Sequence, residues 1–316
     1  MTIAVVGAGA IGGWIAARLA LAGLDVSVVA RGETLAAIDS EGLRLTDNGE
    51  TRCVAVTTSD DPATLGEQDI VIVAVKAPAL VEMASNLEPL IGADTLVIPM
   101  LNGVPWWFTE EPLLSVDPDG AIADAFPFDR IIGCVVHASC RREAPNHVHV
   151  VHAEKLILGE PDGGGSARVA RLCDLFHTEG IRCDRSENIR RAIWYKLWGN
   201  ATINPFSALT RSTADQLLED EAIRLFMAEA MDELAAVGAT IGCPISKSAD
   251  DRMQVTARLG AFKSSMLQDV EAGRPIEIEA LLGAPREIAG RAEVPTPQLD
   301  RIYAMTRLMA DNLSLL

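Results

Sequence analysis

A glycine-rich turn close to the N-terminus constrains the fold of this chain more than any other feature. An apolar, strand-like run at 2–6 leads into the pattern Gly-x-Gly-x-x-Gly, and a helical pattern follows at 10–23. In this context the first glycine permits a tight turn, the second lets a pyrophosphate approach the backbone, and the third lets helix and strand pack closely. The helix N-terminus then offers N–H groups to phosphate. The alternative is a turn that only connects strand and helix. We predict a nucleotide-binding turn made of Gly7, Ala8, Gly9, Ala10, Ile11 and Gly12.

The first half of the chain alternates apolar strands with helices. Runs at 25–31, 69–76 and 95–101 are apolar throughout, as in parallel strands that are covered on both faces. From 131 to 159, strand-like runs joined by polar turns suggest an antiparallel extension of the sheet, and a helix follows at 167–179. This order predicts an α/β Rossmann-type doubly wound sheet.

The second half carries a different pattern, without strand signals. Stretches at 187–203, 219–242 and 301–313 place apolar residues three and four positions apart, which is typical of helices. We therefore predict a second, all-helical domain. Residues 1–184 would form the dinucleotide-binding domain and 185–316 the helical substrate and dimerisation domain, with the ligand site expected between them.

Composition excludes several classes of partner. The net charge of −17 argues against nucleic acid and against an anionic membrane surface, since both require a basic face. No apolar run reaches the roughly 18 residues that cross a bilayer. The N-terminus lacks the basic region of a signal peptide, so we expect a cytoplasmic protein. A homodimer is a further expectation, because the apolar helices could bury an interface as well as a core.

Neither the cysteines nor the histidines form a metal-binding pattern. The six cysteines show no CxxC spacing, which indicates mostly buried, reduced thiols and not a zinc or disulfide framework. His147, His149 and His152 lie close together, and the first two would share one face of a strand. No cysteine or carboxylate pattern completes a ligand set, so a solvated strand is favoured over a metal site.

The residue after the second strand indicates which cofactor is bound. Proteins that prefer NAD carry an acid there, which bonds the ribose hydroxyls. This chain has Arg31 and no acid at that position. An arginine can pair with a 2′-phosphate through two parallel hydrogen bonds, so NADP(H) is favoured. The alternative is an ordinary solvated arginine.

Two polar residues follow the next strands. Lys76 closes the run at 69–76, and Asn102 follows the run at 95–101. Ligands of open α/β sheets lie beyond the carboxyl ends of the strands, so both residues are candidates for cofactor binding. Asn102 precedes Gly103, and Asn-Gly is also a common turn.

One helical stretch in the second half concentrates polar residues on a single face. Lys196 and Asn200 are four residues apart, so they project from the same side of a helix. Asn204 continues that face but precedes Pro205, which predicts that the chain turns there. Bulky apolar residues surround Lys196, and partial burial would weaken its hold on a proton and suit it to proton transfer.

With these motifs the chain resembles the ketopantoate reductase (2-dehydropantoate 2-reductase) family. The likeness extends from the glycine turn through "KLWGNATINPFSAL" at 196–209 to "SSMLQDVEAGRPIEIE" at 264–279. It implies a Rossmann domain followed by a helical domain, with NADPH and a 2-oxo acid between them. It also implies catalytic roles, with Lys196 protonating the carbonyl oxygen and Glu277 holding the substrate hydroxyl.

The resemblance further implies a substrate pocket made of Asn200, Asn204 and Ser265. The last of these would bond the substrate carboxylate. Family members commonly carry an aromatic residue and Asn-Gly after the acidic segment, whereas this chain has Ala-Leu-Leu-Gly at 280–283. Glutamine is common at position 101, where this chain has leucine, and "PWWF" at 105–108 suggests a more apolar pocket.

Three hypotheses follow. The first is NADPH-dependent reduction of 2-dehydropantoate to pantoate, in pantothenate and coenzyme A biosynthesis. The second is a paralogous NADP-dependent enzyme acting on a different small 2-oxo or hydroxy acid. The third is a nicotinamide-binding sensor or interaction protein that has lost catalysis, against which the presence of both Lys196 and Glu277 argues.

Overall fold

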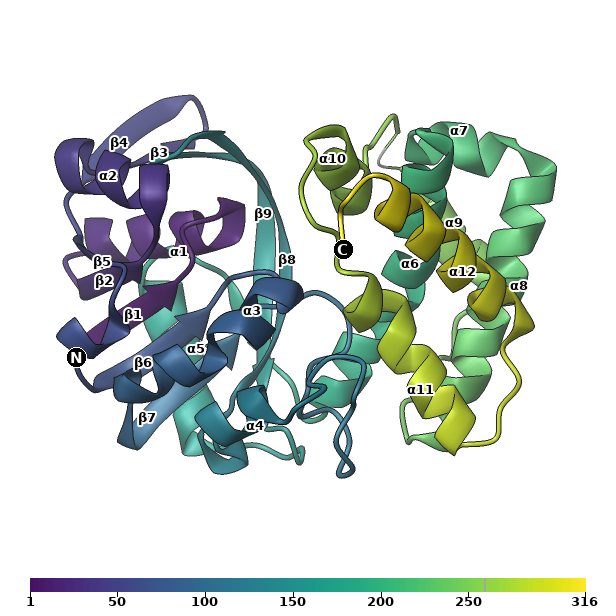
Figure 1. Cartoon of the computed structure of the whole chain (residues 1–316), viewed down its shortest axis with the longest axis horizontal. Coiled ribbons are helices and arrows are strands. Elements are labelled where there is room, and N and C mark those ends of the chain that lie inside the picture. The colour runs from purple at the N-terminus through teal and green to yellow at the C-terminus, as the bar shows by residue number, and fades with distance from the viewer. Residues whose placement is uncertain (259) are drawn as a thin grey trace. The chain divides into compact units, whose positions relative to one another are not determined.

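The computed structural model describes residues 1–258 and 260–316, and these form two compact units (Figure 1). Unit 1 contains Met1–Leu101 and Asp119–Ala192, and unit 2 contains Asn102–Pro118 and Ile193–Leu316. The division therefore falls later than the predicted boundary after residue 184, and the stretch 102–118 belongs to unit 2. This stretch is held there by hydrogen bonds, including one of 2.8 Å from the Val104 N–H to the Ala280 carbonyl.

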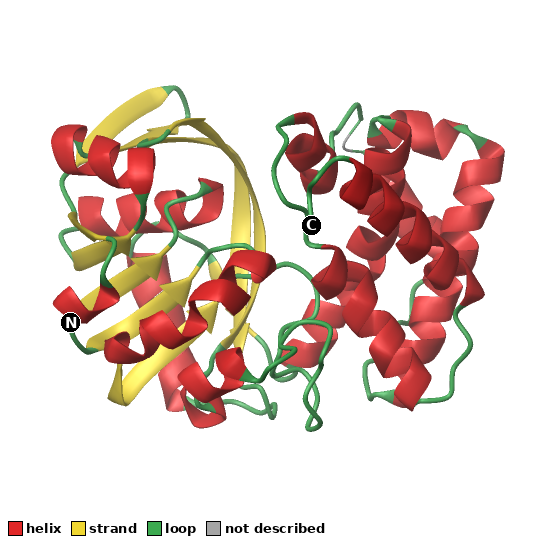
Figure 2. Cartoon of the chain, viewed as in Figure 1, coloured by secondary structure: helices red, strands yellow, loops and turns green. Residues whose placement is uncertain are grey.

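All strands of the described chain lie in unit 1, together with a first set of helices (Figure 2). In chain order its elements are β1 (Thr2–Val6), α1 (Ala10–Leu21), β2 (Asp25–Val29), α2 (Gly32–Glu41), β3 (Leu43–Asp47), β4 (Glu50–Val54), β5 (Thr57–Ser59), β6 (Gln68–Val73), α3 (Ala77–Met83), β7 (Ile91–Pro99), α4 (Ala121–Ala125), β8 (Gly133–Ala144), β9 (His147–Gly159), α5 (Ala167–Thr178) and β10 (Cys183–Arg185). Short 3₁₀ turns are formed by Pro62–Thr64, Ala84–Leu90 and Phe128–Arg130.

The first sheet is fully parallel, in the order β5-β2-β1-β6-β7. The chain moves outward from β1 first on one side and then on the other, which defines a doubly wound sheet. The predicted Rossmann-type fold is confirmed. The carboxyl ends of β1, β2 and β6 lead into the glycine turn, into Arg31 and into Lys76 respectively.

The region 131–159 does not form an antiparallel extension of this sheet, so that prediction was wrong, although an isolated parallel bridge joins Ile131 to Val97 of β7. It contributes to a second sheet in the order β10-β9-β3-β4, with β8 antiparallel to β9. β9 is a single strand of 13 residues that also pairs in parallel with β3 and β10. The sequence suggested breaks because polar residues interrupt the run, but three register shifts against β8 absorb them within one strand.

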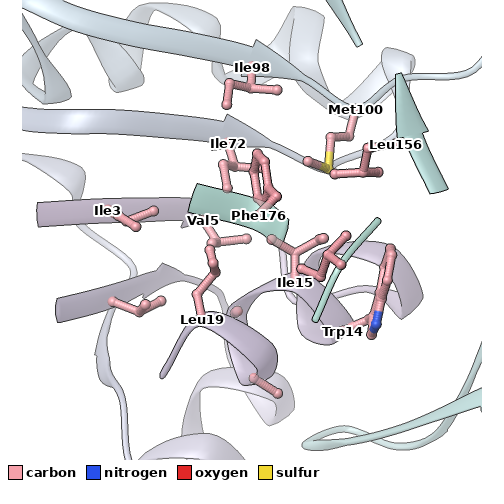
Figure 3. Close-up of a cluster of buried hydrophobic side chains, with 14 of the residues drawn as sticks. Ile3, Val5, Trp14, Ile15, Leu19, Ile72, Ile98, Met100, Leu156 and Phe176 are labelled. Atoms are coloured by element: carbon pink, nitrogen blue, oxygen red, sulfur yellow. The ribbon is translucent and has the colours of Figure 1, made fainter. Parts of the chain in front are cut away.

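Helix α1 joins the two sheets into one core. Trp14, Ile15 and Leu19 are at most 2% exposed, and they belong to a buried cluster that includes side chains from both sheets (Figure 3). A Cβ at Gly13 would lie 2.7 Å from Val148 on β9, so glycine is needed for this close approach. Burying each large aliphatic side chain contributes about 1.5–3 kcal/mol, and this anchors the helix that follows the glycine turn.

Unit 2 is helical, as predicted. Its elements are most of α6 (Ile189–Thr210), then α7 (Ala214–Glu219), α8 (Glu221–Thr240), α9 (Ala249–Ala257), α10 (Ser265–Glu271), a π-helical turn (Glu279–Gly283), α11 (Ala284–Arg291) and α12 (Pro297–Asn312). Across the described residues, no helix is long and apolar enough to cross a membrane.

The predicted turn at Asn204 was wrong, because α6 continues through Pro205 to Thr210. Proline removes one helical hydrogen bond, and its ring crowds the preceding turn. Both flanking residues are buried, Asn204 at 4% and Phe206 at 3% exposure. Tertiary packing on both sides of the proline therefore holds the helix where the local preference would end it.

Candidate functional site

The glycine turn in unit 1 has the close contacts that its sequence pattern predicts. A Cβ at Gly12 would lie 1.9 Å from the Gly7 carbonyl oxygen, so the third glycine allows helix and turn to touch. Gly7 has a φ of +94°, which favours glycine. At Gly9 a Cβ would meet nothing within 4 Å, so this part of the turn is open to a ligand.

Hydrogen bonds tie the turn to the ends of the neighbouring strands. The Gly7 N–H donates to the Val29 carbonyl at 2.9 Å, and the Ala74 N–H donates to the Val6 carbonyl at 2.9 Å. Arg31 lies two residues after β2, is exposed, and precedes α2. Lys76 is half-buried and precedes α3. Unit 1 therefore gathers the glycine turn and both basic candidates beyond the carboxyl ends of three adjacent strands.

In unit 2, two indole rings fix the orientation of α6. The Trp194 indole N–H donates to the Leu234 carbonyl at 3.1 Å, and that of Trp198 donates to the Met231 carbonyl at 2.7 Å. Both acceptors lie on α8. Because successive helical residues are about 100° apart, Lys196 projects from the opposite side of α6. It is therefore directed away from the packing face.

Lys196, Asn102 and Glu277 form a continuous polar chain. The Lys196 ammonium donates to Asn102 Oδ1 at 2.9 Å, and Asn102 Nδ2 donates to Glu277 Oε2 at 3.4 Å. An ammonium group can only donate and a carboxylate can only accept, so these partners dictate which way the amide faces. The structure thus brings together a cation, a neutral bridge and an acid, and all three are half-buried.

A close contact between Gly103 and Ala280 holds the backbone next to these polar side chains. Gly103 has a φ of +81°, and a Cβ there would lie 2.3 Å from the Ala280 carbonyl oxygen. Glu277 is anchored by its neighbours Ile276 and Ile278, which are 1% and 3% exposed. A π-helical turn begins two residues after Glu277, and such turns are frequent at functional sites.

The remaining predicted substrate residues lie on α6 and at the start of α10. Asn204 Nδ2 lies 3.5 Å from the Ser265 hydroxyl. Ser265 is exposed, whereas its neighbour Ser264 is buried and caps α10 by accepting from the Leu267 N–H at 3.1 Å. Asn200 lies one turn after Lys196 on the same side of α6. The adjacent serines therefore have separable roles.

The aromatic residues at 105–108 pack inside unit 2. Trp106, Trp107 and Phe108 are at most 5% exposed, and Phe108 stacks on Trp194 with ring centroids 5.9 Å apart. From the sequence, these side chains were expected to make the ligand pocket more apolar. Their burial beside α6 gives them a structural role, which helps to explain why the stretch 102–118 joins unit 2.

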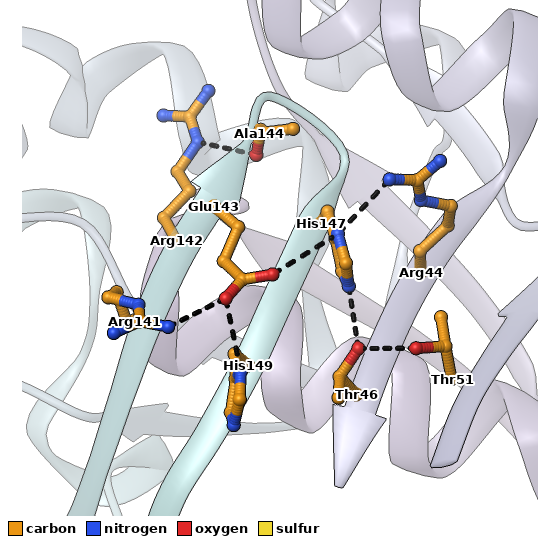
Figure 4. A network of polar contacts seen from close by, with 9 residues as sticks. All are labelled: Arg44, Thr46, Thr51, Arg141, Arg142, Glu143, Ala144, His147 and His149. Carbon is orange, nitrogen blue, oxygen red and sulfur yellow. Dashed lines mark hydrogen bonds and ion pairs between the residues drawn. The ribbon is translucent and has the colours of Figure 1, made fainter. Parts of the chain in front are cut away.

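The three clustered histidines belong to the second sheet of unit 1. His147 contacts Arg44 at 3.1 Å and Thr46 at 2.7 Å, and His149 contacts Glu143 at 3.0 Å (Figure 4). Hydrogen bonds from Arg141 and His149 hold the pKa of Glu143 below its usual value. In the part of the chain that the structure describes, no three histidine, cysteine or acidic side chains are grouped to hold a metal ion.

Comparison with known proteins gives consistent matches over the full chain. A family model described as ketopantoate reductase PanE/ApbA matches residues 3–163, and the model for the C-terminal part of the same family matches 188–310. A 2-dehydropantoate 2-reductase of Mesorhizobium japonicum is 40% identical over 319 residues, which covers 98% of each chain.

Two solved structures extend this likeness to the fold. A protein of Ralstonia solanacearum MolK2 that has been suggested to be a ketopantoate reductase is 48% identical, with a TM-score of 0.97 over 100% of this chain and 99% of that one. The 2-dehydropantoate 2-reductase of Methylococcus capsulatus is 29% identical, with a TM-score of 0.86 over 99% and 98%.

Proposed function

The chain belongs to the ketopantoate reductase PanE/ApbA family, and we propose on that premise that it reduces 2-dehydropantoate to pantoate with NADPH. This reaction would serve pantothenate and coenzyme A biosynthesis. The observation that carries the proposal is the Lys196–Asn102–Glu277 chain in unit 2. Ketone reduction needs a proton donor at the carbonyl oxygen and polar groups that hold the substrate in place. These three side chains offer both.

The glycine turn of unit 1 suits a dinucleotide. Gly9 leaves open space where a pyrophosphate approaches the backbone, and α1 presents its N-terminus there. Arg31 would pair with the 2′-phosphate of NADP(H), and Lys76 would meet further negative charge. The bound cofactor supplies the hydride, so the protein has to orient and polarise the substrate.

Lys196 is assigned as the general acid. Its Nζ would donate a proton to the carbonyl oxygen as negative charge develops there. Asn102 Oδ1, 2.9 Å from Nζ, limits the positions that the ammonium group can take. Since Asn102 also donates to Glu277, a positioning role for Asn102 is proposed in addition to cofactor contact. Restricting the donor in this way lowers the entropy cost of reaching the reactive geometry.

The other polar residues of unit 2 are assigned to the substrate. Glu277 would accept a hydrogen bond from the substrate hydroxyl. The Ser265 hydroxyl would donate to the substrate carboxylate, and the amides of Asn200 and Asn204 would complete the pocket. Asn204 already lies 3.5 Å from Ser265, which supports a shared task for these two residues.

The Lys196→Ala variant tests this assignment. General acid catalysis contributes about 10²- to 10⁴-fold, so kcat for 2-dehydropantoate should fall by that factor, with a much smaller change in the KM for NADPH. The matched control is Lys263→Ala, because Lys263 is exposed and pairs with Glu271 at 2.8 Å on the same unit. Unchanged turnover in Lys196→Ala would remove the lysine from the mechanism. A higher kcat/KM for another 2-oxo acid in a substrate panel would replace the substrate named here.

Homodimerisation and a cytoplasmic location complete the proposal. On α12, Met305 and Leu308 are 42% and 62% exposed, and burying them in an interface would be favourable. All six cysteines are free thiols, a state that the reducing cytoplasm maintains. Light scattering coupled to size-exclusion chromatography measures the mass directly, and a monomeric mass would refute the dimer.

A further inference from the structure

Unit 1 contains a pocket that is lined by none of the residues assigned above. Its volume is about 310 Å³, and its walls come from α1, from residues 150–155 of β9 and from the turn after α5. The lining includes Trp14, Arg18, Asp47, Lys155 and Arg182. We call it the α1–β9 pocket. It shares no lining residue with the glycine turn, Arg31 or Lys76.

The pocket lies where one edge of β9 is open. β8 follows one edge of β9 over its whole length. On the other edge, β3 pairs with residues 147–149 and β10 pairs with residues 156–158. No strand in the described part of the chain pairs with the edge at 150–155 between them. Two register shifts against β8 fall in the same stretch, and bulges of this kind are frequent beside binding sites.

Two buried hydrogen-bond donors beside this gap lack an acceptor in the described part of the chain. The buried Trp14 Nε1 and Arg18 Nε atoms have no hydrogen-bond partner among the described residues. By contrast, the indoles of Trp194 and Trp198 each reach a carbonyl. A buried donor that stays unpaired costs about 1–3 kcal/mol, so a ligand that brings acceptor atoms would be stabilised here.

The charges around the gap also favour an anion. Lys155 and Arg182 share the carboxylate of Asp184, at 2.7 and 3.4 Å. Arg18 pairs with Asp47, but burial and the nearby charge of Arg52 lower its pKa. Three cations, Arg18, Lys155 and Arg182, therefore line the gap in a protein with a net charge of −17. The nearby acids are Asp47, Asp184 and Glu154.

We propose that the α1–β9 pocket binds the phosphate or carboxylate group of a small metabolite. Arg182 and Lys155 would bind the anion through charge-assisted hydrogen bonds, with Arg18 and the Trp14 indole on the opposite wall. Pockets for small organic ligands start at about 300 Å³, so a pocket of this volume suits a compact anion. The site would share no residue with the cofactor turn or with the Lys196–Asn102–Glu277 chain.

Indole N–H signals in ¹H–¹⁵N NMR spectra test this proposal on the full chain. The chain has five tryptophans, and the Trp14→Phe variant identifies the Trp14 signal. Titration with inorganic phosphate and, separately, with succinate should shift the Trp14 signal in a saturable way with at least one of them. The anion that shifts the Trp14 signal identifies phosphate or carboxylate as the recognised group. Trp107, whose buried Nε1 also lacks a partner but lies in unit 2, serves as the reference signal and should not move.

A pair of arginine variants separates this pocket from other anion sites. Arg182→Gln should weaken the binding that Trp14 reports by at least about tenfold. Arg185→Gln should leave it unchanged, because Arg185 pairs with Asp174 and is not part of the pocket lining. Both arginines are more than half exposed, so neither variant is expected to unfold the protein. The proposal is overturned if neither anion shifts the Trp14 signal, or if both variants respond like the parent.

Discussion

Replacing Gly103 with alanine is expected to damage activity through a displacement that the structure allows us to estimate. A Cβ at this position would lie 2.3 Å from the Ala280 carbonyl oxygen, and ordinary contacts begin at 3.4 Å. Both groups belong to backbone that cannot rotate away. The two segments must therefore separate by about 1 Å, and this moves Asn102 relative to Glu277.

Two contributions set the loss of stability, and the displacement sets the loss of turnover. Alanine at a φ of +81° costs about 1–2 kcal/mol, and losing the Val104–Ala280 hydrogen bond costs about 0.5–1.5 kcal/mol. The free energy of unfolding should therefore fall by about 1.5–3.5 kcal/mol. A displacement of 1 Å at a reacting group can lower turnover by about 10²-fold, so kcat should fall by a similar factor.

Gly120→Ala is the matched control for the backbone conformation alone. Gly120 has a φ of +75°, and a Cβ there would meet nothing within 4 Å. This variant should lose about 1–2 kcal/mol and keep its kcat. Urea denaturation followed by circular dichroism gives the stabilities, and NADPH oxidation with 2-dehydropantoate gives kcat. A folded Gly103→Ala enzyme with the kcat of the parent would refute the link between this contact and the Lys196–Asn102–Glu277 chain.

Other substitutions test separate parts of the structure. Arg31→Ala should raise the KM for NADPH by at least about tenfold and leave the KM for NADH nearly unchanged. Steady-state kinetics with both cofactors measure the two values, and an equal rise in both would contradict the assignment of Arg31. Ser264→Ala should lower the free energy of unfolding by about 1 kcal/mol at constant KM, whereas Ser265→Ala should raise the KM for the 2-oxo acid at nearly constant stability. Arg168 hydrogen bonds hold the pKa of Glu160 below its usual value. The stability this pair contributes is present above the unfolded-state pKa and is lost as the pH falls through the folded-state pKa. Urea unfolding of Arg168→Gln at a series of pH values should therefore show a smaller loss of stability in acid than the parent, and an equal loss would contradict the assignment.

The glycine turn illustrates what a sequence can predict about this fold. Gly7 and Gly12 are required by a positive φ and by a close approach within a few residues of each other. Such constraints are local, so the pattern and its flanking strand and helix contain all the information needed. The parallel sheet follows for a similar reason, since uninterrupted apolar strands alternate with helices.

Features that depend on contacts between distant residues could not be predicted from the sequence. β9 pairs with β3 across about a hundred residues, and the polar residues along it resemble breaks between short strands. At Pro205 the local preference ends a helix, but buried neighbours extend it. In both cases tertiary packing outweighs a local signal of about 3 kcal/mol or less.

Asn102 shows why the candidate site was only partly predictable. Its contacts, Lys196 and Glu277, are 94 and 175 residues away in the chain. Near Gly103 the sequence predicts a turn. The backbone does bend there, and the bend also directs the Asn102 amide between a cation and an acid. A hydroxyl group would have to accept and donate through one oxygen, and a carboxylate would repel Glu277. An amide separates an acceptor from a donor without adding charge, so this residue type suits a bridge that must hold Lys196 and Glu277 in register.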